Sequence, residues 1–141
     1  MTPRREAVDT LSQGFLSPTT DSETRQTLLT QARSACSSAA ADVQDTGVVV
    51  SDVQMLPWHL SLNQAKSRYL AHNAVWLRQF RECAVDPVKW RDQAFGSEID
   101  ATFRVAHRSF QGAVSFLPLN RAPERIAAIF KERLASARTV G

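Results

Sequence analysis

Apolar side chains recur every three or four residues along most of this 141-residue chain, and only a helix brings such residues onto one face. The clearest stripe predicts a helix over residues 61–84 and consists of Leu62, Ala65, Tyr69, Trp76, Phe80 and Cys83. Its polar side is expected to carry Arg68, His72, Gln79 and Glu82. Ser61 and Gln64 have the spacing of a capping box at its start. The helix should end near Ala84, because Asp86 precedes a proline and such residues disfavour helical geometry.

A second stripe, made mostly of small residues, predicts a helix from Thr20 to Thr46. Its members are Leu28, Ala32, Cys36, Ala39 and Val43. Thr20 and Glu23 have the spacing of a capping box, which satisfies free backbone N–H groups at a helix start. Gly47 suits the position just after a helix end, where glycine is favoured. We therefore expect this helix to stop at Gly47.

Three further helices are predicted in the C-terminal half. A short one should run from Pro87 to Phe95 and stop at Gly96. A longer one, capped by Ser97, carries the stripe Ile99, Phe103, Ala106, Phe110 and Val114. The last begins near Ala122-Pro123 and presents Ile126, Ile129, Phe130 and Leu134. The expected fold class is all-α: a small helical bundle of four main helices plus one short helix, with Phe80, Phe103 and Phe110 in its core.

The remaining segments do not follow a helical stripe. Residues 1–20 are polar and contain Pro3, Gly14 and Pro18, which predicts an extended N-terminal arm. Residues 1–18 are expected to be disordered in isolation, with one helical turn over Asp9–Leu16 as the alternative. Residues 21–141 are expected to form a single helical domain. Within it, residues 47–60 form an apolar connector, either a short strand or an extended linker. A sheet is disfavoured because the chain has no second strand candidate.

Charge is distributed unevenly along the chain. Residues 1–60 hold 4 basic and 7 acidic residues, whereas residues 61–141 hold 13 basic and 7 acidic ones, and arginine outnumbers lysine by 14 to 3. A GC-rich genome would explain the arginines, and so would a surface for an acidic partner or nucleic acid. The candidate binding residues are Arg68, Arg78, Arg104 and Arg108. Acidic residues interleave with them, which favours a solvated, salt-bridged face over a dense recognition surface.

No residue pattern indicates catalysis, a metal site or a cofactor. The three histidines are far apart in the sequence and lack nearby ligands, and no glycine-rich phosphate loop is present. Cys36 and Cys83 lie at apolar helical positions, so we expect buried free thiols, although a bridge between them is possible. No apolar stretch is long enough to span a membrane, and the N-terminus lacks a secretory apolar region. We therefore expect an intracellular setting, in cytoplasm, organelle or virion.

The connector holds the most unusual residues, Met55, Leu56 and Trp58. Such side chains are costly to leave in water, so they either fold back on the core or form an anchor for a partner. The resulting hypothesis is a non-catalytic accessory or structural subunit that docks into a larger multiprotein assembly, such as a viral particle, a ribosome-like particle or an organellar complex. The alternative is an Arg-rich protein that binds nucleic acid, without sequence specificity, or another anionic partner.

Overall fold

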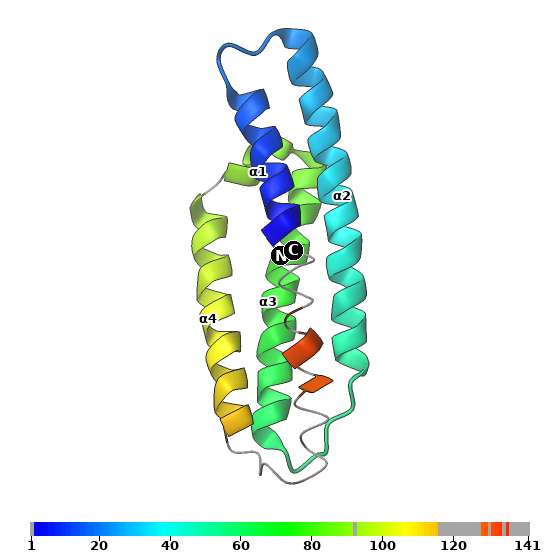
Figure 1. Ribbon diagram of the computed structural model, residues 1–141, viewed down its shortest axis with the longest axis vertical. Coiled ribbons are helices and arrows are strands. Elements are labelled where there is room, and N and C mark those ends of the chain that lie inside the picture. The colour runs from blue at the N-terminus through cyan, green and yellow to red at the C-terminus, as the bar shows by residue number, and fades with distance from the viewer. Residues whose placement is uncertain (1, 92, 116–127, 130, 134, 136–141) are drawn as a thin grey trace.

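The computed structural model describes residues 2–91, 93–115, 128–129, 131–133 and 135 (Figure 1). This part of the chain is all-α, which confirms the expected helical bundle. Its elements are α1 (Thr2–Leu16), α2 (Ser22–Asp52), α3 (Leu60–Val85), the 3₁₀ helix η1 (Pro87–Arg91) and α4 (Gln93–Ser115). The described residues beyond 127 are helical too. The expected start of the last helix, at Ala122-Pro123, lies outside the described residues, as do Ile126, Phe130 and Leu134.

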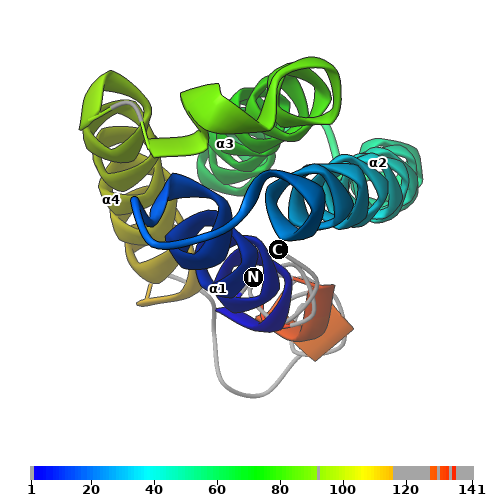
Figure 2. The same cartoon turned by 90° about the horizontal axis from the view of Figure 1, so that it is seen from above.

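Three long helices, α2, α3 and α4, run side by side along the molecule (Figure 1). Seen from the end, α3 lies between α2 and α4, and α1 completes the cross-section (Figure 2). α3 packs against both α2 and α4, while α1 packs against α2 and η1. A 15-residue helix is about 22 Å long and a 31-residue helix about 46 Å, so α1 covers only about half of α2.

The expectation of an extended arm over residues 1–20 is wrong, because most of that segment is α1. Val8, Ser12 and Phe15 follow one another at helical spacing and are 0%, 0% and 3% exposed. Two apolar side chains on one face are enough to order a helix when long helices already offer a surface to bury them.

Side-chain contacts fix α1 to the rest of the bundle. The indole Nε1 of Trp90 donates to the Asp9 carboxylate at 2.7 Å, and Arg4 forms an ion pair with Asp42 of α2. At the other end, the Thr20 hydroxyl donates to the carbonyl of Gly14 at 2.7 Å. α1 is therefore held at both ends.

The helix starts differ from the expected capping boxes. α2 is capped by Asp21, one residue later than expected, whose carboxylate accepts the backbone N–H of Thr24 at 2.8 Å. That hydrogen bond lowers the pKa of Asp21. α3 begins after His59, which makes no side-chain cap, and α4 begins at Gln93 rather than after Ser97. The expected boxes at Thr20–Glu23 and Ser61–Gln64 are both wrong.

Gly47 does not end α2, which continues to Asp52. A Cβ at this position would lie 2.6 Å from Nδ2 of Asn73, so the glycine makes room for α3. The connector is correspondingly shorter than expected, residues 53–59, and is not a strand.

The core consists of two clusters along the bundle. The first lies beneath α1 and comprises Val8, Cys36, Ala39, Ala40, Val43, Val75, Trp76, Phe80, Cys83, Trp90 and Ile99. The second comprises Val50, Leu62, Ala65, Tyr69, Phe110 and Ala113. The stripe predicted for residues 61–84 is buried throughout, and Phe80 and Phe110 are core residues, whereas Phe103 is only half-buried.

The polar side expected for α3 is partly wrong. His72 and Gln79 are each only 6% exposed. The physical reason is the central place of α3: it packs on α2 along one side and on α4 along the other, so it buries more than one stripe.

A disulfide joins Cys36 of α2 to Cys83 of α3, with the two Cα atoms 5.8 Å apart. Both side chains are buried, as expected, but the expectation of free thiols is wrong. The bond closes a loop between residues that are 47 apart in the sequence and fixes how α2 and α3 sit against each other.

Candidate functional site

Exposed apolar side chains gather at one end of the bundle. Among the described residues, ten large apolar side chains are exposed, and five of them lie in the stretch from residue 48 to residue 60. They are Val48, Val49, Leu56, Trp58 and Leu60, and we call them the apolar end. Trp58 is 72% exposed and Leu60 76%. α2 turns into α3 at this end, the lower one in Figure 1.

The sequence identified this site in part. Leu56 and Trp58 are exposed, as a docking anchor requires, whereas Met55 packs against the second core cluster. The exposure of Trp58 overturns the alternative in which its side chain folds back on the core. Val48, Val49 and Leu60 were not singled out from the sequence, although the expected connector, residues 47–60, contained them.

The connector backbone is pinned rather than loose. The side-chain amide of Asn63 donates to the carbonyls of Leu56 and His59, both at 3.2 Å. The Lys66 ammonium donates to the carbonyls of Ser51 and Val53, at 2.6 and 2.7 Å. Those carbonyls belong to the last turn of α2 and the residue after it, where a cation is favourable. Trp58 is thus presented from a preorganised turn.

Charges of both signs lie at this end. Asp45 and Asp52 are exposed on the final turns of α2, and Arg68 is exposed in the first turns of α3. The Lys66 ammonium keeps its charge while it donates to backbone carbonyls. The described residues of this end therefore have no strong excess of either sign.

Two of the four arginines predicted as binding residues contact groups within the bundle. Arg68, Arg78, Arg104 and Arg108 are all exposed. Arg78 of α3 forms an ion pair with Glu98 of α4, and Arg104 donates to the carbonyl of Asp100 within its own helix at 3.2 Å. These two side chains have roles within the bundle.

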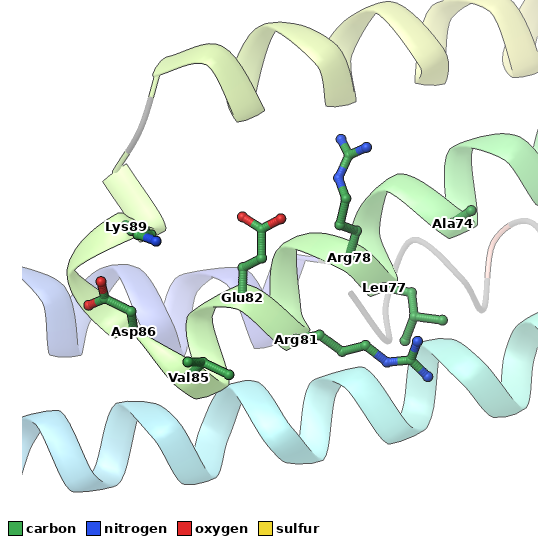
Figure 3. Close-up of a pocket in the computed structure, with 8 residues that line it drawn as sticks. All are labelled: Ala74, Leu77, Arg78, Arg81, Glu82, Val85, Asp86 and Lys89. Carbon is green, nitrogen blue, oxygen red and sulfur yellow. The ribbon is translucent and has the colours of Figure 1, made fainter.

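A surface hollow of about 530 Å³ lies over the outer face of α3. Figure 3 shows the residues that line it. Arg78 extends toward α4, and the guanidinium of Arg81 donates to the side chain of Gln44 on α2 at 2.8 Å (Figure 3). Glu82 and Asp86 line the same hollow, together with Lys89. With both signs of charge interleaved, the hollow resembles a salt-bridged surface more than a phosphate-binding one.

Clusters of metal-ligating side chains were sought among the described residues. In the part of the chain that the structure describes, no three His, Cys, Asp or Glu side chains come close enough to hold a metal ion. Both cysteines are used in the disulfide.

Comparison with known protein families, curated proteins and solved structures finds no match to this chain. Over the described residues, none of the helices combines the length and the apolar character that crossing a bilayer demands. Function must therefore be argued from the geometry alone.

Proposed function

We propose that this protein is a non-catalytic subunit that docks onto another protein through the apolar end, with Trp58 as its anchor. The observation that carries the proposal is the 72% exposure of Trp58, flanked by the exposed Leu56 and Leu60. Exposed apolar residues scattered singly are ordinary, but five within residues 48–60 mark a surface made to be covered.

The pinned connector supports this role. Ordering a loop on binding costs free energy, and a turn already fixed by Asn63 and Lys66 avoids much of that cost. Tryptophan is among the residues that most often dominate binding energy when they enter a partner's pocket.

The exposed side chains specify the partner's chemistry. Leu56, Trp58 and Leu60 favour a partner with an apolar pocket. The exposed Asp52 and Arg68 beside them favour a polar rim around that pocket. The alternative function, binding of a nucleic acid by the Arg-rich half, has weaker support because Arg78, Arg81 and Arg104 engage groups within the bundle.

The disulfide is relevant to the cellular compartment in which such a subunit functions. Structural disulfides persist in oxidising compartments and are rare in the reducing cytosol. We therefore propose an oxidising compartment, and the virion or organelle interior fits this better than the cytoplasm. Alkylation of thiols during lysis directly into denaturant tests it, because both side chains are buried in the folded protein. Cys36 and Cys83 should stay unlabelled, and labelling of both would contradict the proposal.

The experiment on docking compares Trp58→Ala with a matched control, Val85→Ala. Val85 is 79% exposed but lies at the far end of α3, about 38 Å from Leu60 along the helix. Each purified variant is used as bait in its native host, and bound proteins are quantified by mass spectrometry.

The expected result is at least one protein that the wild-type chain and Val85→Ala capture equally and that Trp58→Ala loses. For that partner, purified, we expect Kd to rise at least ~30-fold, the equivalent of about 2 kcal/mol. Thermal stability should be equal in all three proteins, because both side chains are exposed. Identical capture by Trp58→Ala, or retention of the wild-type chain on nucleic acid at ~200 mM salt, would contradict the proposal.

A further inference from the structure

The two most exposed large apolar side chains among the described residues lie at opposite ends of one helix, α3. Val85 is 79% exposed and Leu60 is 76% exposed. They are 25 residues apart, which is almost a whole number of helical turns at 3.6 residues per turn. Both side chains therefore lie on the same side of α3, one at each end of it.

The side of α3 that carries these two residues follows a regular spacing. Its eight positions alternate between four and three residues apart, and all of them are exposed: Leu60, Gln64, Ser67, Ala71, Ala74, Arg78, Arg81 and Val85. This is the outer face of α3, since α3 packs on α2 and α4 with its other sides. The same spacing occurs where one helix packs along another in a coiled coil. The outer face is therefore suited to a second long helix.

The middle of the outer face is formed by short side chains. Ser67, Ala71 and Ala74 project little from the helix, and small residues let two helix axes approach to about 8 Å. Ala74 and Val85 also line the hollow of about 530 Å³, and Figure 3 shows them along α3 between α4 and α2. A helix laid on this face can thus come close to α3.

The two arginines of the outer face are drawn away from its centre. Arg78 forms an ion pair with Glu98 of α4, whereas Arg81 donates to the side chain of Gln44 on α2 at 2.8 Å. In Figure 3 the Arg78 side chain extends toward α4 and the Arg81 side chain extends in a different direction. These contacts leave the line from Ala74 to Val85 accessible to another helix.

The order of residues along this face matches its own reverse. When a second α3 lies antiparallel on the first, with a two-fold axis between Ala71 and Ala74, each contact occurs twice. Leu60 then lies opposite Val85 of the second copy, and Ala71 lies opposite its Ala74. A second copy of this chain therefore covers both of the most exposed apolar residues of α3 at once.

Charge favours the antiparallel arrangement over the parallel one. In the antiparallel pair Arg81 lies opposite Gln64 of the other copy and Arg78 lies opposite its Ser67, so each guanidinium faces an uncharged acceptor. In a parallel pair each arginine would face the same arginine of the other copy, and such like charges repel.

The size of the outer face is sufficient for a dimer. The face is about 38 Å long, and with the adjoining edges of α2 and α4 it is about two helix diameters, or ~20 Å, wide. The resulting area is close to the ~800 Å² that each partner contributes to a standard interface. Because half of the eight positions are polar, we expect a reversible dimer with a Kd on the order of 10–100 μM.

We propose that two copies of this chain associate through the outer face of α3, with the two helices antiparallel across a two-fold axis between Ala71 and Ala74. Trp58 lies outside this face, in the connector that precedes α3. The dimer is therefore separate from the docking role proposed above and presents one Trp58 at each end of the paired helices.

Sedimentation equilibrium of the full-length protein from about 1 to 500 μM tests the association. The expected result is a reversible monomer–dimer equilibrium. Ala74→Lys should raise its Kd at least ~10-fold, because it brings two ammonium groups and two long side chains to the centre of the contact. The matched control is Ala7→Lys, the same change at an exposed position of α1, across the bundle from the outer face of α3 (Figure 2), and it should leave the Kd unchanged.

Chemical cross-linking tests the orientation. Gln64→Cys and Arg81→Cys are prepared separately and treated with a short bis-maleimide, alone and mixed; Cys36 and Cys83 do not react because they form the disulfide. The mixture should cross-link and neither variant alone should, since either position lies about 26 Å from the same position of the second copy.

Four results would overturn the proposal. They are the absence of a dimer at ~500 μM, an unchanged Kd in Ala74→Lys, efficient cross-linking of either cysteine variant alone, and loss of the dimer in Trp58→Ala. The last result would place the contact between copies at the apolar end instead.

Discussion

Replacing Gly47 with alanine should destabilise this protein, although the same change inside a helix is usually favourable. Gly47 lies within α2, and its missing side chain leaves room for the Asn73 amide of α3. A Cβ built there would be 2.6 Å from Asn73 Nδ2, well inside van der Waals contact. That amide is not a flexible surface group, because it donates to the carbonyl of Val43 at 3.1 Å and Asn73 is 8% exposed.

Two opposing contributions set the change in the free energy of unfolding that Gly47→Ala causes. Alanine in place of a helical glycine stabilises by about 0.5–1 kcal/mol through backbone entropy. Displacing Asn73 breaks a buried hydrogen bond and leaves its groups unpaired, which costs roughly 1–3 kcal/mol. We expect a net loss of about 1–2 kcal/mol for Gly47→Ala.

Gly112 provides the matched control, because it also lies inside a helix, α4, and a Cβ there meets nothing within 4 Å. Gly112→Ala should therefore gain up to about 1 kcal/mol. Urea unfolding with a common m-value measures both variants. In an Asn73→Ala background, where the obstructing amide is gone, Gly47→Ala should cease to destabilise. If Gly47→Ala stabilises the unaltered chain as much as Gly112→Ala does, α2 and α3 do not approach each other as described.

Three other substitutions test the core. Replacing both Cys36 and Cys83 by alanine should lower the free energy of unfolding by about 4 kcal/mol, the chain-entropy value for a 47-residue separation, and an effect below ~1 kcal/mol in urea unfolding would contradict it. Burial lowers the folded pKa of His72 to about 4, against 6.5 unfolded, so only the unfolded chain takes up its proton between these values. Stability should fall by about 2–3 kcal/mol as the pH drops through this window; His72→Gln should lose this pH dependence and His59→Gln should keep it. Phe80→Ala should cost about 3–5 kcal/mol in thermal unfolding, since Phe80 is fully buried, and an unchanged midpoint would argue against its core position.

The long helices were predictable because their signal lies within each helix. Leu62, Ala65, Trp76 and Phe80 repeat at helical spacing, and such a repeat specifies both the element and its buried face. α1 was not predicted, since its face contains a serine, Ser12, between two apolar residues and it depends on α2 for burial. Local composition could not reveal a helix whose stability comes from packing on its neighbours.

The candidate site was predictable only where exposure follows from position in a loop. Leu56 and Trp58 lie between two helices wherever the helix ends are placed. Exposure of both side chains was therefore one of the two predicted alternatives, the other being burial against the core. The binding role of Arg78 was weakened by a partner 20 residues away, Glu98, which periodicity within one helix cannot identify.

The register between neighbouring helices decides which residues meet across them. Two independent contacts define this register for α2 and α3. Cys36 bonds to Cys83, and about 16 Å further along α2 Gly47 meets Asn73. Cys36 precedes Gly47 by 11 residues while Cys83 follows Asn73 by 10, as antiparallel helices in one register require. A shift of one turn would separate the cysteines and place a side chain against Asn73. It would also rotate Tyr69 and His72, on α3, relative to α4. The disulfide and the contact between Gly47 and Asn73 therefore stabilise the arrangement of α2 and α3, and with it the face that α3 presents to α4.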